Sequence, residues 1–182
     1  MNDERIISCK LIDYLEKVYD FDFIAREVPF SLGERRADLV AASKKQGVTY
    51  AFEIKSDSDT LTRLKGQLEA YRTTFNYVNV VTTHKYLSAV KQYGLWFGIL
   101  LINEDGVITE ERKPRKRLLS NHSYDRPLLK EYHGDYNRGY VEWLCQRYEP
   151  LYDLFVKERT TSATTIEDIK ILSLRSDRIT IL

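Results

Sequence analysis

The sequence predicts an α/β fold in which a mixed β-sheet is flanked by helices and is followed by a C-terminal helical extension. Apolar runs with period-two alternation recur between residues 23 and 112, and segments with helical periodicity separate several of them. A chain of 182 residues that is 43% apolar can bury one core with an appended element. We therefore expect a core over residues 1–113 and a mostly helical extension over residues 114–182 that packs on it.

The first part of the chain predicts two helices and three strands. Apolar residues at helical spacing indicate an amphipathic helix over about residues 4–18. Strands are expected near residues 23–30, 37–42 and 48–56, and a short polar link suggests that the last two form a hairpin. The second helix is expected to start at Asp59 or Thr60, either of which can cap it, and to run to about Phe75.

The remaining pattern completes the sheet and adds the extension. A strand is expected at 77–82, a helix from about His84 to Tyr93, and a hairpin over 97–103 and 107–112 that turns at Gly106. Beyond residue 114, helical spacing over 141–148 is followed by Pro150, which is typical of a helix start. Thr165 can cap a short last helix before a strand-like end at 178–182.

Charged residues interrupt the apolar strands at three positions. Alternation places Glu53 and Lys55 on the same face of their strand, and an antiparallel hairpin can bring Asp38 beside Glu53. A buried, unpaired carboxylate costs several kcal/mol or becomes protonated, so these charges need a shared explanation. One explanation is a functional cluster of Asp38, Glu53 and Lys55, and the other is a solvated salt bridge on an exposed hairpin.

The chemistry of the functional reading is that of a metal-dependent phosphodiesterase. Two adjacent carboxylates repel each other unless a cation lies between them, and hard oxygen ligands suit Mg²⁺ or Mn²⁺. The ammonium of Lys55 could orient a water or neutralise charge on a pentavalent phosphate. Gln67 and Tyr71, four residues apart on the following helix, share a face, although Tyr71 alone is also compatible with a core aromatic and Gln67 with a solvated side chain.

The order of these elements resembles the core of the PD-(D/E)XK nuclease superfamily, including the Q-x-x-x-Y helix of its exonuclease-like branches. More narrowly, the chain resembles a small group of largely uncharacterised bacterial and phage proteins assigned to that superfamily. The similarity covers roughly residues 1–110, and one departure is that Ala37 stands in place of the proline that names the superfamily. The motifs that carry it are Gly33-Glu-Arg-Arg-Ala-Asp38, Ala51-Phe-Glu-Ile-Lys-Ser-Asp57, Asp59-Thr-Leu-Thr-Arg-Leu64 and Gln67-Leu-Glu-Ala-Tyr71.

This resemblance implies a restriction-endonuclease-like fold and a metal-dependent nuclease that hydrolyses DNA, or alternatively RNA. By resemblance, Asp38 and Glu53 hold Mg²⁺ or Mn²⁺, and Lys55 assists the attacking water. Gln67 and Tyr71 match positions that steady the site or contact the nucleic-acid backbone. A third acid often completes such a site, and Glu27, Glu16 and Asp13 are candidates. Glu27 could instead pair with Arg26, Arg35 or Arg36, and Arg36 is counted with Glu27 among the supporting residues.

Composition and charge limit the possible partners. The formal charge of +1 gives no global signal for nucleic acid, so any binding surface must be local. Residues 112–117 hold five cations in six positions, which suits either a phosphate-binding patch or a solvated linker. Tyrosines and cations also interleave from Tyr124 to Tyr152, where bases could stack, but helical spacing favours packing of the extension. We expect nucleic acid, DNA in the first instance, as the partner, with a homodimer or a protein partner as further options.

Location and redox state follow from what the sequence contains. The longest apolar run, 95–102, is far too short to span a membrane, and the first residues lack the pattern of a secretory signal, so we expect a cytoplasmic protein without membrane association. Cys9 and Cys145 read as reduced core thiols, and the three histidines do not have zinc-site spacing.

The rival function is a non-catalytic module on the same fold, binding nucleic acid or protein and needing a partner.

Overall fold

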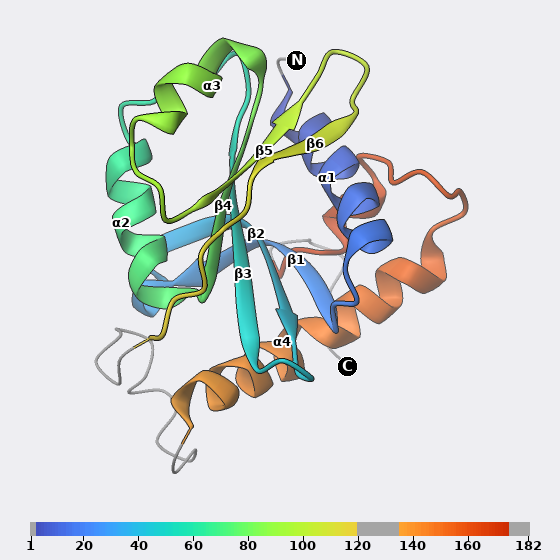
Figure 1. Ribbon diagram of the computed structural model, residues 1–182. Helices are drawn as coiled ribbons and strands as arrows, with labels where there is room; N and C mark the ends of the chain where they lie inside the picture. The colour runs from blue at the N-terminus through green and yellow to red at the C-terminus, as the bar shows by residue number, and fades with distance from the viewer. Residues whose placement is uncertain (1–2, 120–134, 175–182) are drawn as a thin grey trace.

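A computed structural model describes residues 3–119 and 135–174, and it shows a six-stranded mixed sheet flanked by helices (Figure 1). The strands lie side by side in chain order. The predicted fold class is therefore confirmed. The strands are β1 (Phe23–Phe30), β2 (Arg35–Ser43), β3 (Val48–Lys55), β4 (Tyr77–Thr82), β5 (Gly98–Ile102) and β6 (Ile108–Arg112), and the α-helices are α1 (Glu4–Val18), α2 (Leu64–Thr74), α3 (His84–Lys91) and α4 (Tyr136–Glu158), with short 3₁₀ turns η1 (Ser31–Gly33) and η3 (Asp168–Lys170).

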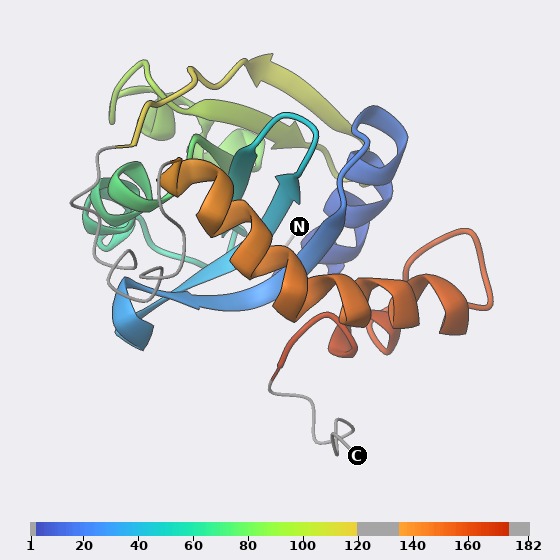
Figure 2. The same ribbon diagram turned by 90° about the horizontal axis from the view of Figure 1, so that it is seen from below.

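Two hydrophobic clusters cover the two faces of the sheet. On one face, α1 and the segment around η3 pack against residues such as Leu39, Phe52 and Ile54. On the other face, α2, α3 and most of α4 pack against residues such as Val40 and Ala51. The long helix α4 crosses beneath β1, and its C-terminal part projects past the edge of the sheet (Figure 2). The C-terminal extension thus completes the core.

The pairing of neighbouring strands changes from antiparallel to parallel at β3, in the centre of the sheet. Strands β1, β2 and β3 are antiparallel, whereas β3, β4 and β5 are parallel, so α2 and α3 serve as crossover connections. Ladder pairing between β2 and β3 stops at Leu39 opposite Phe52. The next ladder positions, Asp38 and Glu53, therefore lie where the two strands separate. This separation leaves room for polar side chains inside an otherwise apolar sheet.

The predicted starts of two helices differ from the structure. Helix α2 begins at Leu64 and not at Asp59, because the Asp59 carboxylate accepts hydrogen bonds from the amide and the hydroxyl of Ser56, both at 2.7 Å, and so stabilises a turn. Helix α4 continues through Pro150, where a new helix was expected. Its buried residues, including Tyr148 and Leu151, pack continuously on the sheet, and this packing outweighs the missing proline hydrogen bond.

Several expectations lie outside the described residues. These are the strand-like end at 178–182, His122, and the cations Arg126, Lys130 and His133 of the tyrosine-rich stretch. Thr165 does cap the last turn as predicted, since its hydroxyl accepts from the Asp168 amide at 3.3 Å. Across the two described ranges, no helix is both long and apolar enough to span a membrane.

Candidate active site

Glu53 and Lys55 sit near the end of the central strand β3 and are both buried, with exposed fractions of 0% and 5%. The Lys55 Nζ donates to Glu53 Oε1 at 2.6 Å. The other carboxylate oxygen, Oε2, accepts from the Tyr71 hydroxyl of α2 at 2.7 Å. The structure thus brings together three of the predicted site residues, and it excludes the reading of Glu53 and Lys55 as a solvated surface pair.

Asp38 joins the same cluster from β2. Its Oδ2 accepts from the Ile54 backbone amide at 2.8 Å, so the side chain takes the place of a ladder partner where β2 and β3 separate. Its own amide donates to the Tyr71 hydroxyl at 3.3 Å. The Tyr71 hydroxyl therefore connects Asp38 and Glu53. Tyr71 is thus more than an apolar core residue, which was the alternative that the sequence left open.

The cluster holds two acids, Asp38 and Glu53, and one cation, Lys55. Burial raises the pKa of Asp38 well above its ordinary value, and the nearby carboxylates of Glu53 and Glu4 raise it further. Burial also raises the pKa of the Tyr71 hydroxyl well above its usual range, reinforced by Asp38 and Glu53. Two ionised carboxylates beside one ammonium would leave an uncompensated charge, which either a proton on Asp38 or a bound cation relieves.

These residues suit a divalent cation chemically. Hard carboxylate oxygens are the ligands that Mg²⁺ and Mn²⁺ prefer, and Mg²⁺ commonly uses one or two of them and completes its shell with waters. Within the described ranges, no group of three or more His, Cys, Asp or Glu side chains is arranged to hold a metal ion. A cation here would therefore rest on Asp38 and Glu53 with the remaining ligands from water or substrate.

Glu4 is the acidic residue that sequence reasoning missed. It is an exposed residue in the first turn of α1, and partial desolvation raises its pKa, with Arg26 lowering it and the carboxylates of Asp59 and Glu53 raising it further. The three acids that the sequence offers as third ligands lie elsewhere: Glu16 binds Arg159, Asp13 accepts from the Thr164 amide at 2.9 Å, and Glu27 accepts from the Ser173 hydroxyl at 3.2 Å. A first-turn acid is an ordinary helix signal, which is why it did not stand out.

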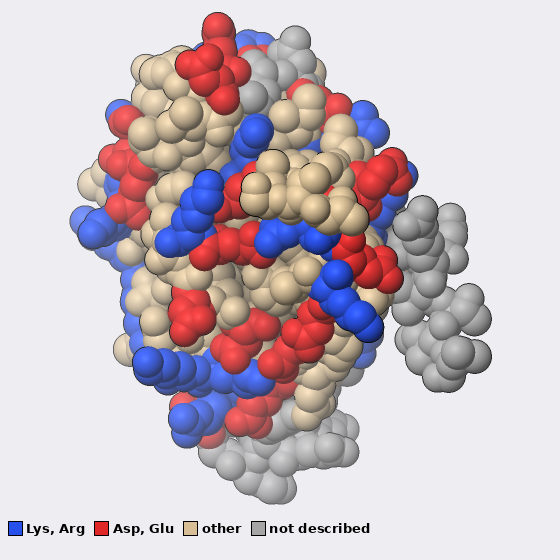
Figure 3. All heavy atoms as spheres, turned by 90° about the vertical axis from the view of Figure 1, so that its right-hand side faces the viewer, with Lys and Arg blue, Asp and Glu red and all other residues tan. Residues whose placement is uncertain are grey.

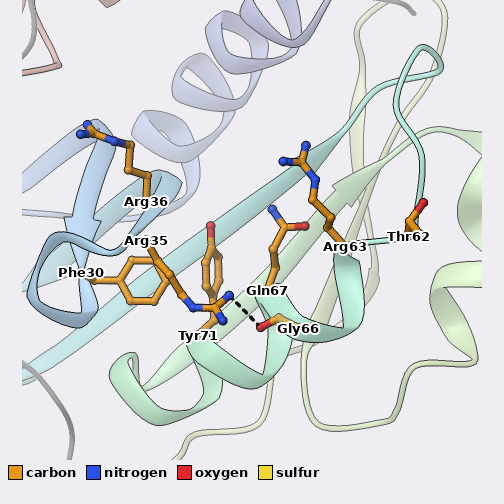
Figure 4. Close-up of a pocket in the computed structure, with 8 residues that line it drawn as sticks. All are labelled: Phe30, Arg35, Arg36, Thr62, Arg63, Gly66, Gln67 and Tyr71. Atoms are coloured by element: carbon orange, nitrogen blue, oxygen red, sulfur yellow. Dashed lines mark hydrogen bonds between the residues drawn. The ribbon is translucent and has the colours of Figure 1, made fainter.

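Gln67 and the arginines of β2 line a pocket of about 430 Å³ beside the cluster. The Gln67 Oε1 is buried and has no hydrogen-bond partner within the described chain. Figure 4 shows the side chains of Arg63, Gln67 and Tyr71 rising from the same side of α2, while Arg36 points away at the rim. The pocket is lined by Phe30, Arg35, Arg36, Thr62, Arg63, Gly66, Gln67 and Tyr71.

The basic run at 112–117 divides into fixed and free cations. Arg112 Nε donates to the Phe97 carbonyl at 2.9 Å, and Arg117 Nε donates to the Arg72 carbonyl at 3.2 Å. Desolvation lowers the pKa of both Arg112 and Arg117. Lys113, Arg115 and Lys116 remain exposed. The run is thus anchored to the core, and half of it still faces solvent.

The two cysteines do not take part in this site. Cys9 and Cys145 are free and buried. Burial raises the pKa of Cys9 to about 11 and that of Cys145 to about 12, so both remain thiols at neutral pH. Their reading as core thiols is confirmed.

Fold and site together define an α/β protein with a buried acid–lysine–tyrosine cluster beside an arginine-lined pocket. Residues 1–131 match the family model described as Bacteriophage P4 protein cII, and this chain belongs to that family. The match includes the whole sheet and every residue of the cluster.

One relative and one solved structure extend the comparison. Protein cII of Enterobacteria phage P4 is 37% identical over 91 residues, which are 49% of this chain and 33% of that relative, so the match spans a third of the relative's length. The SPO1766 protein of unknown function from Silicibacter pomeroyi matches with a TM-score of 0.57 at 11% identity, covering 84% of this chain and 89% of that protein. At that identity the likeness concerns the fold alone.

Proposed function

We propose that this protein is a metal-dependent nuclease that hydrolyses phosphodiester bonds, with DNA as its first candidate substrate and RNA as the second. The observation that carries the proposal is the meeting of Asp38 and Glu53 at the point where β2 and β3 separate, with Lys55 bonded to Glu53. Such a cluster costs stability in a sheet interior, so its presence favours a function for it.

Each residue has a distinct part in the proposed reaction. Asp38 and Glu53 would hold Mg²⁺ or Mn²⁺, which, when bound, supplies Lewis-acid stabilisation of the phosphate and a more acidic water. Lys55 would leave Glu53 to orient the attacking water and to offset negative charge that builds on the phosphate. Tyr71 would hold the Glu53 carboxylate against the backbone of Asp38, because its hydroxyl donates to Glu53 and accepts from the Asp38 amide.

The second candidate function is a non-catalytic module that binds nucleic acid or protein with the help of a partner. Two observations favour it: the formal charge is only +1, and both Glu53 oxygens are engaged by Lys55 and Tyr71. In that case the cluster would serve only as an internal network.

A cleavage panel separates these functions. The purified chain is incubated with single-stranded, duplex and branched DNA and with RNA, in Mg²⁺, in Mn²⁺ and in EDTA. The nuclease proposal predicts metal-dependent cleavage of at least one substrate and its loss in Lys55→Ala. The matched control is Lys157→Ala, an exposed cation in the last turn of α4, which should cleave like the wild type. Activity that survives Lys55→Ala, or no activity on any substrate, would refute the nuclease proposal.

A further inference from the structure

The arginine-lined pocket beside the cluster has features of a phosphate subsite. Arg35 and Arg63 approach it from β2 and from the residue before α2, and both are exposed. The Arg35 guanidinium reaches across to the Gly66 carbonyl with a long hydrogen bond of 3.4 Å, which holds it over the first turn of α2 (Figure 4). Arginine guanidinium groups bind phosphates through several donors at once.

The pocket leads toward the buried cluster. Tyr71 lines the pocket and also donates its hydroxyl to Glu53. Gln67 stands one turn before Tyr71, and its buried oxygen without a described partner offers an acceptor to a ligand group, such as the amino group of a base. Phe30 supplies an apolar wall. The pocket therefore combines cations, an aromatic wall and a free acceptor, which together match a nucleotide.

A second basic group lies at the other end of α2. Arg72, in the last turn, places its guanidinium carbon 5.6 Å from the centre of the Trp96 ring, and Arg117 lies 5.7 Å from the same ring. The Arg117 amide is fixed by the Asn76 carbonyl at 2.8 Å. The segment that carries the exposed cations Arg115 and Lys116 is thus anchored beside the C-terminal end of α2.

Helix α2 joins these two basic groups. Arg72 follows Arg63 by nine positions, which corresponds to about 13 Å along a helix and about two and a half turns, so the two side chains leave α2 on opposite flanks of its exposed face. This length matches a few nucleotides of a strand. Between them, Lys65 is exposed, and Glu69 is the acidic residue of this helix. The face seen in Figure 3, by contrast, shows acidic and basic side chains interleaved.

We infer that a single strand of nucleic acid crosses the exposed face of α2 obliquely, with one phosphate in the Arg35–Arg63 pocket and its continuation near Arg72 and Arg115. A single strand fits better than a duplex because Glu53 is fully buried and Lys55 is 5% exposed, behind a pocket of about 430 Å³. A flexible strand can bend one nucleotide into such a pocket, whereas a paired duplex must first be opened. This inference deepens the proposed function but concerns binding and not cleavage.

Binding can be measured without hydrolysis. Fluorescence anisotropy in EDTA compares a labelled single-stranded DNA, the RNA of the same sequence, and the corresponding duplex, over a range of salt concentrations. We expect each single strand to bind more tightly than the duplex, by about fivefold or more. The strand that binds more tightly shows whether DNA or RNA is the preferred ligand. Duplex binding equal to or tighter than both single strands would overturn the inference.

Variants test the location of the strand. Arg35→Gln with Arg63→Gln should weaken single-strand binding by about tenfold and lower the salt slope by about 0.7, because both guanidinium contacts to the one phosphate in the pocket are lost. Glu69→Gln should strengthen binding slightly, since it removes the negative charge between the basic groups. Lys157→Gln, far along α4, is the matched control and should bind like the wild type. Thermal unfolding confirms that each variant is folded.

The strand site and the nuclease activity can be refuted independently of each other. Single-strand binding that depends on Arg35 and Arg63 but is accompanied by no cleavage would support the strand site and refute the nuclease. Metal-dependent cleavage together with unchanged binding in the double arginine variant would keep the nuclease and refute the strand site.

Discussion

Glu53 and Glu16 lie on opposite sides of the sheet and are each held by a tyrosine hydroxyl and a cation. Glu53 accepts from Tyr71 at 2.7 Å and pairs with Lys55 at 2.6 Å. Glu16 accepts from Tyr152 at 3.1 Å and pairs with Arg159 at 2.7 Å. The same three kinds of group thus occur twice in one molecule.

The two networks differ in burial and in charge. The side chains of Lys55 and Glu53 are 6% and 1% exposed, whereas those of Arg159 and Glu16 are 17% and 19% exposed. In the buried network the second acid, Asp38, has a pKa raised by burial and by its neighbours, whereas the acid near the Glu16 network, Asp13, accepts from the Thr164 amide and interacts with Arg159. The Glu16 network ties α1 to α4 at the surface of the core, which is a structural task. The extra buried charge is what distinguishes the Glu53 network as a candidate for chemistry.

The largest expected difference between the networks is in catalysis. Glu53→Gln should lower metal-dependent cleavage by about 100-fold or more, because it removes a proposed metal ligand and the partner of Lys55. Glu16→Gln is the matched substitution and should leave cleavage within about twofold of the wild type. The two cleavage rates are compared in the same single-turnover assay. Equal losses in both variants would contradict the claim that only the Glu53 network takes part in catalysis.

The hydroxyls of the two tyrosines should differ in their contribution to stability. Tyr71→Phe removes the donor to a buried carboxylate and should lower the free energy of unfolding by about 2 kcal/mol. Tyr152→Phe removes a longer bond at a partly exposed carboxylate and should cost about 1 kcal/mol or less. Urea unfolding of both variants in EDTA measures the difference. A larger loss in the free energy of unfolding for Tyr152→Phe would contradict the view that the buried Glu53 carboxylate depends more strongly on its tyrosine hydroxyl.

The pH dependence of stability tests the excess charge directly. Because the pKa of Asp38 is raised in the folded protein, the folded state keeps this proton between pH 3.8 and the raised value, and Asp38 lowers stability as the pH rises through that window. Asp38→Asn keeps an oxygen for the Ile54 amide and removes the charge. We expect it to raise Tm at pH 7 in EDTA by about 2–4 °C.

The same comparison at low pH is the control for that prediction. Below the ordinary value of 3.8, Asp38 is protonated in both the folded and the unfolded chain, so the advantage of Asp38→Asn should disappear. If Asp38→Asn is less stable than the wild type at pH 7, the contacts of Asp38 fully offset the free-energy cost of burying it, and the prediction is wrong.

The smallest effect is expected at Glu4. Its carboxylate influences Asp38 and Glu53 from the first turn of α1, but it belongs to no preformed ligand set in the described chain. Glu4→Gln should weaken Mn²⁺ binding by about two- to fivefold through lost negative charge. Asp13→Asn is the matched control on the same helix and should leave Mn²⁺ affinity unchanged, as titration calorimetry can show.

Much of the fold was predictable because its signals are local. Alternation in β3 and helical periodicity in α1 follow directly from which residues are buried, and both elements have the expected bounds within a residue. Helix α4 was not predictable as one element, because the packing that carries it through Pro150 is tertiary. The delayed start of α2 likewise depends on a turn that Asp59 makes with Ser56.

The site was predictable only in part. The pairing of Asp38, Glu53 and Lys55 follows from strand alternation and a hairpin, both of which are visible in the sequence. Glu4 is brought near them by the packing of α1 on the sheet, and nothing in its local sequence marks this. The arginine pocket depends on how β2 and α2 face each other across the end of the sheet, which spacing alone does not fix.

Titration of the apo protein with Mn²⁺ by calorimetry is the most direct test of the claim that the Glu53 network is a cation site. We expect binding in the millimolar range or tighter for the wild type and for Glu16→Gln, and its loss in Asp38→Ala. No detectable binding by the wild type in that range, or equal binding by Asp38→Ala, would contradict it.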